Sequence, residues 1–186
     1  MIKTIKGLKP RLGKGCYVAE TAAVVGDVVM GDECSVWYSA VVRGDMERIR
    51  IGDRVNIQDC AVIHVTPGYG DVCIGNDVTI GHNATVHGAK IEDKVLIGMG
   101  ATLLDNCHVG HGAIIAAGAL VLKNTQIGPG EVWGGVPAKC IKRLSDGTGE
   151  KLNAENALHY LEWTPYYIEE NPETEANNQT PPMPVF

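Results

Sequence analysis

Aromatic residues are scarce in this chain of 186 residues. They make up 5% of the sequence, and the single phenylalanine is Phe186. This scarcity argues against the bulky core of a β-sandwich or a helical bundle. Glycine is abundant instead, at 23 residues, and 45% of the chain is apolar. The composition therefore predicts one domain whose core is built from layers of small aliphatic side chains.

The chain also lacks the features of several protein classes. Basic residues number 16 against 22 acidic ones and form no block, so nucleic acid is not expected as a partner. No run approaches the ~18 consecutive apolar residues that a membrane-spanning helix needs. The N-terminal segment is basic but lacks the apolar stretch that a secretory signal requires. The cysteines form no C-x-x-C pair, which favours reduced thiols and a cytoplasmic location. They are Cys16, Cys34, Cys60, Cys73, Cys107 and Cys140.

An aliphatic residue recurs at every sixth position, often followed by glycine. The series is Val18, Val24, Met30, Val36 and Val42, then Ile51, Ile57 and Ile63, then Ile74, Ile80, Val86, Ile91, Ile97, Leu103, Val109, Ile115, Val121, Ile127 and Trp133. An α-helix cannot keep a strict period of six on one face, and simple alternation does not produce it. A three-sided parallel β-helix does, because each hexad forms one side and three hexads form one coil. We therefore favour this fold over an ordinary β-sandwich.

Breaks in the repeat define the organisation of the chain. We expect an N-terminal segment (residues 1–17), a β-helix (18–140), a C-terminal α-helix packed on it (150–170) and a Pro-rich flexible tail (171–186). Pro165 is expected to kink or split the helix. Its apolar strip is expected to comprise Leu152, Asn156, Leu158, Leu161 and Trp163. The flat sides of such a prism favour burial against further copies, with a homotrimer as the natural symmetric solution.

Three histidines lie close together in the repeat and are candidate metal ligands. His64 and His82 are separated by three hexads, formally one coil, and His87 follows at the fifth position after His82. Three imidazoles and an open water position are typical of catalytic zinc, and a neighbouring chain could supply one of the three. His108, His111 and His159 lack such neighbours and are expected to be solvated.

Polar residues upstream of His64 are candidates for supporting roles. Arg43 and Asp45 could form a bidentate ion pair that joins subunits, or a weak surface pair. Gln58 could orient a metal-bound hydroxide, or it could be a solvated amide. Asn56 and Asp59 lie on either side of it.

Taken in order, these residues resemble a known family. Arg43-Gly44-Asp45, Asn56-x-Gln58-Asp59, His64 and the segment GHNATVH with His82 and His87 are similar to the motifs of the γ-class carbonic anhydrases. These proteins are a branch of the left-handed β-helix hexapeptide-repeat proteins, and the resemblance covers about residues 8–170, with the short-loop members as the nearest match.

The resemblance implies an all-β, left-handed parallel β-helix that assembles as a homotrimer. It implies one metal ion per chain between subunits, zinc or alternatively iron or cobalt. His64 and His87 would come from one chain and His82 from its neighbour. Arg43 and Asp45 would be the interface ion pair. Asn56 and Gln58 would lie near the metal-bound water, with Asp59 close by.

The implied reaction is attack of a metal-bound hydroxide on CO2 to give bicarbonate. The most active family members carry an acidic proton-shuttle loop that this chain lacks. The link from His64 to His82 contains no glutamate, and Met46 follows Asp45 where the family prototype has an acid. Tyr160 or Tyr69 would have to replace the shuttle, so slow turnover is expected.

Two other classes of function fit the same pattern. Many hexapeptide-repeat proteins act on acyl-CoA as acyltransferases, and a metal-assisted acyl-CoA thioesterase is a variant of that hypothesis. The third hypothesis is a non-catalytic trimer that binds metal. Metal content distinguishes the acyl-CoA enzymes from the anhydrase. Catalytic activity distinguishes both kinds of enzyme from the non-catalytic trimer.

Overall fold

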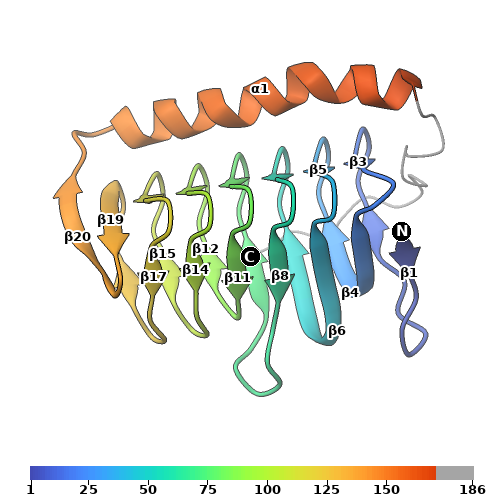
Figure 1. Cartoon of the computed structure of the whole chain (residues 1–186), viewed down its shortest axis with the longest axis horizontal. Helices are drawn as coiled ribbons and strands as arrows, with labels where there is room; N and C mark the ends of the chain where they lie inside the picture. The colour runs from blue at the N-terminus through green and yellow to red at the C-terminus, as the bar shows by residue number, and fades with distance from the viewer. Residues whose placement is uncertain (171–186) are drawn as a thin grey trace.

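The computed structural model describes residues 1–170, and these form a three-sided parallel β-helix with one long helix beside it. Figure 1 shows the coils stacked along one axis and the helix α1 lying across all of them. The parallel β-solenoid predicted from the six-residue period, its left hand implied by the family resemblance, and the predicted C-terminal helix are confirmed.

Short strands make up the three faces of the prism. Two longer strands bend around a corner, so that each contributes to both the first and the second face. The first face contains β1 (Ile2–Lys3), the first halves of β4 (Ala23–Met30) and β6 (Val41–Ile51), β8 (Val62–His64), β11 (Thr85–His87), β14 (Thr102–Leu103) and β17 (Leu120–Val121). The second face contains β2 (Arg11–Leu12), the second halves of β4 and β6, β9 (Val72–Ile74), β12 (Lys90–Ile91), β15 (His108–Val109) and β18 (Gln126–Ile127). The third face contains β3 (Tyr17–Val18), β5 (Ser35–Val36), β7 (Asn56–Ile57), β10 (Thr79–Ile80), β13 (Leu96–Ile97), β16 (Ile114–Ile115), β19 (Glu131–Gly135) and β20 (Ala138–Arg143).

The core is a set of aliphatic columns that run through the coils. On the third face Ile57 pairs with Ile80, and Ile80 pairs with Ile97. Every member of the six-residue series from Val18 to Ile127 is at most 5% exposed, as predicted. The six cysteines are free thiols, and three of them are buried in this core.

Left-handed backbone conformations mark the corners. Many of the corner residues have φ near +60°, which asparagine and aspartate tolerate better than most residues. The corner set includes Glu33, Ser39, Arg54, Cys60, Asp77, Asn83, Lys94, Asn106 and Asn124. At another corner the side-chain oxygens of Asp32, Asp53, Asn76 and Asp93 each accept a hydrogen bond from a backbone N–H of the preceding coil. These bonds tie successive coils together where no strand pairing is available.

The coils differ in length, and the extra residues leave the prism at its corners. Ile63 pairs with Val86, and Val86 in turn pairs with Leu103, so the coil that begins at Ile63 is longer than the one after it. The insertion forms the loop between β8 and β9, which protrudes from the prism on the side away from α1 (Figure 1). The expectation that His64 and His82 are one coil apart is therefore wrong, because His64 pairs with His87.

The helix α1 (Thr148–Glu170) covers the third face. Its buried residues are Gly149, Asn153, Ala157 and Thr164, and Asn153 donates hydrogen bonds to the carbonyl oxygens of Lys94 and Ala113. The helix therefore lies on the coils through small and polar side chains, and partly buried Tyr160, Tyr167 and Ile168 also pack against the core.

The expected apolar strip is wrong, since Leu152, Leu158 and Trp163 are exposed. The helix also does not split at Pro165 but continues through it. The hydroxyl of Thr164 donates to the carbonyl oxygen of Tyr160, a local bond within this last part of the helix.

The N-terminal segment joins the prism, because β1 and β2 both pair with β4. The predicted tail, residues 171–186, lies outside the described residues. Within residues 1–170, no helix is long and apolar enough to cross a membrane.

Two neighbouring residues of β12 provide a test of the core. Ile91 is buried in a column between Ile74 and Val109, whereas Lys90 points outward. We expect Ile91→Ala to lower the free energy of unfolding by about 2–5 kcal/mol, because it opens a cavity that stacked coils cannot collapse to fill. Chemical denaturation measures this loss. Lys90→Ala is the matched control and should change stability little, so equal losses in the two variants would contradict the assignment of the core.

Candidate metal centre

Two of the three predicted metal ligands meet at one edge of the first face. His64 ends β8 and His87 ends β11, and the strand pairing places them in register on adjacent coils. Nδ1 of His64 lies 3.2 Å from Nε2 of His87, and the two ring centroids are 5.2 Å apart. The lengthened coil between β8 and β11 is what brings these imidazoles together.

His82 lies at the other edge of the same face, at the corner before β11 begins. Within residues 1–170 of one chain, no group of three or more His, Cys, Asp or Glu side chains is placed to hold a metal ion. Within one chain, His64 and His87 therefore lie side by side, whereas His82 lies apart from them at the opposite edge of the face.

Asp45 and Arg43 support His64. Oδ1 of Asp45 lies 3.2 Å from Nε2 of His64, and its Oδ2 accepts a hydrogen bond from Arg43 at 2.6 Å. Burial alone would raise the pKa of Asp45, but the hydrogen bonds from Arg43 and His64 lower it overall. Burial, followed by the charge of Arg43, lowers the pKa of His64. His64 is therefore neutral near pH 7, which is the form that binds metals. The Arg43–Asp45 pair forms within the chain, and its expected role between subunits stays a prediction.

Asp105 and Lys123 support His87, and the sequence analysis missed both. Oδ1 of Asp105 lies 2.8 Å from Nδ1 of His87, and Nζ of Lys123 lies 3.2 Å from Oδ2. Burial would raise the pKa of Asp105, but its bonds to His87 and Lys123 lower it, so the carboxylate stays ionised. Asp105 reaches His87 across Gly88, where a Cβ atom would lie 2.6 Å from Oδ1.

The repeat in the sequence contains the information needed to find Asp105 and Lys123. Leu103 pairs with Val121, so Asp105 and Lys123 occupy equivalent positions on neighbouring coils. Stacking the coils in their true register would have revealed them. Lys123 also lies over the ring of Tyr69, at 4.7 Å from its centroid, which places Tyr69 on this side of the site.

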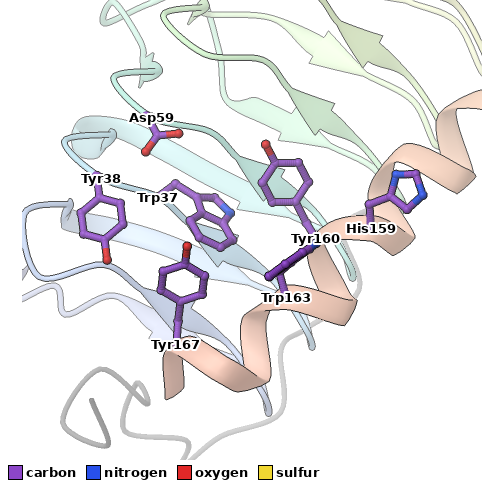
Figure 2. Close-up of a pocket in the computed structure, with 7 residues that line it drawn as sticks. All are labelled: Trp37, Tyr38, Asp59, His159, Tyr160, Trp163 and Tyr167. Carbon is purple, nitrogen blue, oxygen red and sulfur yellow. The ribbon is translucent and has the colours of Figure 1, made fainter. Parts of the chain in front are cut away.

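His82 has its own carboxylate partner. Nδ1 of His82 lies 2.8 Å from Oδ2 of Asp59. Asp59 also lines a pocket of about 400 Å³ together with Tyr160 (Figure 2). Burial, and then the charge of Asp59, raise the pKa of Tyr160, so its phenol keeps its proton at neutral pH. The two tyrosines proposed as shuttles therefore lie on opposite sides of the divided ligand set.

Gln58 and Asn56 form a buried hydrogen-bonded chain that ends at His82. The amide of Asn56 donates to Thr79, and Gln58 donates to Oδ1 of Asn56 at 3.0 Å. Oε1 of Gln58 accepts a hydrogen bond from the backbone N–H of His82 at 3.1 Å. Gln58 thus fixes the turn that carries His82, and one N–H of its amide remains for a ligand.

The other histidines are separate from this site. His108 lies 2.8 Å from Glu92 and His111 lies 3.4 Å from Glu150, so each half-buried imidazole has a glutamate beside it and no second histidine. His159 lines the pocket on α1.

Comparisons with known proteins agree with this fold and set of residues. The family described as "Bacterial transferase hexapeptide (six repeats)" matches residues 88–123. "Gamma carbonic anhydrase 2, mitochondrial" from Arabidopsis thaliana is 43% identical over 167 residues, which are 87% of this chain. The chain spans only 60% of the length of that relative.

Two further proteins are similar over nearly their whole length. A Methanocaldococcus jannaschii protein, named as a candidate carbonic anhydrase, is 45% identical over 150 residues, or 81% of this chain and 93% of its own. A solved structure from Bacillus cereus, described as a candidate acetyltransferase, superposes with a TM-score of 0.86 at 37% identity, covering 92% of this chain and 98% of its own. With these relatives and this arrangement of histidines and carboxylates, the chain belongs to the γ-class carbonic anhydrase family of hexapeptide-repeat proteins.

Proposed function

We propose that this protein is a metal-dependent, carbonic-anhydrase-like enzyme that acts as a homotrimer and converts CO2 to bicarbonate. The observation that carries the proposal is the divided ligand set. His64 and His87 lie at one edge of the first face and His82 lies at the other, and each has a carboxylate oxygen within 3.2 Å of a ring nitrogen.

The outer surfaces of the three faces support assembly through the first face. Its central column is uncharged and half-buried: Ala23, Val41, Val62, Thr85, Thr102 and Leu120. The matching column of the second face includes Arg11, Arg50, Lys90 and His108. The third face is already covered by α1. A second copy of the chain is the occupant that would bring the opposite edge, with His82, to His64 and His87. In a ring of three, each chain offers one edge to each of two neighbours.

The donor set fits a divalent transition metal. Asp105 on Nδ1 of His87 and Asp59 beside Nδ1 of His82 leave Nε2 of each ring without a carboxylate partner, Nε2 of His87 faces Nδ1 of His64 at 3.2 Å, and His64 is held neutral. A carboxylate behind a ligating histidine fixes the tautomer and strengthens the ligand. His64, His82 and His87 would hold the ion, with one ion per chain. Three imidazoles suit zinc, iron and cobalt alike.

When bound, such an ion makes water acidic enough to act as a nucleophile near neutral pH. The chain's own residues orient the reactants. Gln58 is locked by Asn56 and by the backbone of His82, so its remaining N–H can donate to the water or to CO2 at a fixed position. Asp45 and Arg43 hold a charged pair beside His64.

Proton release is the weak step of this proposal. Met46 is exposed where an acid would serve, and Asp71 of the loop is paired with Arg48. Tyr160 keeps its proton because its pKa is raised, so it is better suited to orienting water than to exchanging protons.

Acyl-CoA chemistry remains the second candidate, supported by the hexapeptide-transferase family match and by the similarity to the Bacillus cereus candidate acetyltransferase. Those likenesses support the fold, whereas the split histidine set favours the metal-dependent candidate. A non-catalytic trimer that binds metal is the third candidate. Stopped-flow CO2 hydration, run beside thiol release from acyl-CoA, separates the three.

The first prediction from this proposal concerns His82. We expect His82→Ala to lower the metal content well below one ion per chain and to leave the oligomer intact, because a zinc site loses one of three protein ligands. Elemental analysis with sedimentation measures both. His159→Ala is the matched control and should keep its metal. Full metal in His82→Ala would show that the ligand assignment is wrong.

The second prediction concerns Arg43. We expect Arg43→Ala to shift the trimer toward monomers by about tenfold or more in dissociation constant, since removal of one charge leaves Asp45 uncompensated. Sedimentation velocity across a dilution series measures the shift. Arg48→Ala, on the same strand and also in an ion pair, is the control for loss of a charge. Identical profiles for both variants would remove Arg43 from the interface.

The third prediction concerns proton transfer. We expect the rate of CO2 hydration to rise severalfold with imidazole concentration at constant pH and ionic strength, because a buffer replaces the missing shuttle. Met46→Glu should reduce this dependence. A rate that does not respond to buffer would mean that the chain has an efficient shuttle of its own.

A further inference from the structure

Aromatic side chains are rare in this chain, yet they gather around one pocket. Two of the three tryptophans and three of the six tyrosines line a pocket of about 400 Å³ between α1 and the first coils. Figure 2 shows Trp37 between Tyr38 and Tyr160, with Tyr167 and Trp163 coming from the helix. A concentration of this kind in an aromatic-poor protein is evidence of a binding site.

One wall of the pocket is rigid and the other is open. The ring centroid of Trp37 lies 5.0 Å from that of Tyr167 and 5.2 Å from that of Tyr160, both edge-to-face. Trp37 is buried, so this wall is formed before any ligand arrives. Trp163 is 60% exposed and leaves a large apolar surface in water. A ligand that entered here would gain contact with aromatic rings at little cost in protein ordering.

The pocket lining contains one carboxylate, from Asp59, and one imidazole, from His159. Asp59 is the acidic group among the lining residues, and no lysine or arginine is among them. Its Oδ2 holds His82, and its Oδ1 has no protein partner in the described part of the chain. The raised pKa of Tyr160 reflects burial first and then the negative charge of Asp59.

We propose that this pocket binds a small organic cation with a methylated ammonium group, held by the aromatic rings and by Asp59. Such a cation is attracted to the faces of tryptophan and tyrosine within ~6 Å of the ring centroid, and Asp59 supplies the counter-charge. An anion would meet the carboxylate with no lysine or arginine in the lining to offset it. A neutral apolar ligand would leave the free oxygen of Asp59 desolvated.

The proposal does not depend on the metal or on CO2 chemistry, because none of the lining residues is one of the three candidate ligands. Protein stripped with chelator is therefore the right material for the test. A failure of the metal proposal and a failure of this one are then separate results.

Choline and its neutral isostere 3,3-dimethylbutan-1-ol are the probes, because they share a shape and differ in charge. Trp37 and Trp163 report occupancy by fluorescence, and Trp133 lies in the last coil as an internal reference. We expect saturable binding of choline, with a dissociation constant at least about tenfold lower than that of the isostere, which corresponds to ~1.4 kcal/mol. Calorimetry on the same samples checks the difference.

Substitutions assign the effect to the pocket. Asp59→Asn should remove the preference for choline over the isostere, whereas Glu162→Gln removes the same charge from an exposed position on α1 outside the lining and should keep it. Trp163→Leu, at an exposed position, should weaken choline severalfold. It also keeps the proposal testable should Asp59→Asn fail to fold.

Three outcomes would overturn the proposal. The first is equal binding of choline and the isostere, which would make the pocket an apolar site. The second is no saturable binding of choline to the folded protein. The third is unchanged choline binding in Trp163→Leu.

Discussion

The register between coils is the constraint on which the rest of this structure depends. Each aliphatic side chain must lie on the one in the coil before it, and the buried columns are continuous from Val18 to Ile127. Because hydrogen bonds between parallel strands fix this alignment, a coil cannot absorb extra residues inside the prism. The insertions therefore leave at a corner, as the loop between β8 and β9 does. His64 and His87 come into register because that loop expels the extra residues and restores the alignment.

The three faces bear different surfaces, and this difference organises the proposed site. The helix covers the third face, charged side chains occupy the second, and uncharged β-branched and small side chains run along the first. The ligand-bearing corners are the two edges of that uncharged face. Burial of an apolar face against another copy is favourable by the hydrophobic effect alone. Assembly and completion of the ligand set would then follow from the same contact, which explains why neither half-site needs to be complete in one chain.

The core was predictable from sequence, and the contacts of the site were only partly so. One aliphatic residue per hexad is a signal repeated along the whole chain, so local irregularities do not hide it. The pairing of His64 with His87 was not predictable from a uniform coil of three hexads, because the register depends on how many residues a loop expels. Asp105 and Lys123 were missed for the same reason. The predicted buried face of α1 was wrong because hydrophobicity was taken as the guide, whereas the helix buries Asn153, which donates to backbone carbonyl groups of the coils, and the small side chain of Ala157.

Asp59 connects the proposed metal centre to the aromatic pocket through one carboxylate. One of its oxygens lies 2.8 Å from Nδ1 of His82, and the other has no hydrogen bond or ion pair within the described residues. A cation in the pocket would draw on the same negative charge that orients His82, so occupancy of the pocket and affinity for the metal would be coupled. Such coupling is reciprocal, because a free-energy cycle links the two binding events. Either proposed site could therefore exist without the other, but the affinity for the cation and the affinity for the metal would be coupled. The size of this coupling depends on how strongly the Asp59 carboxylate interacts with His82 and with the cation at the same time.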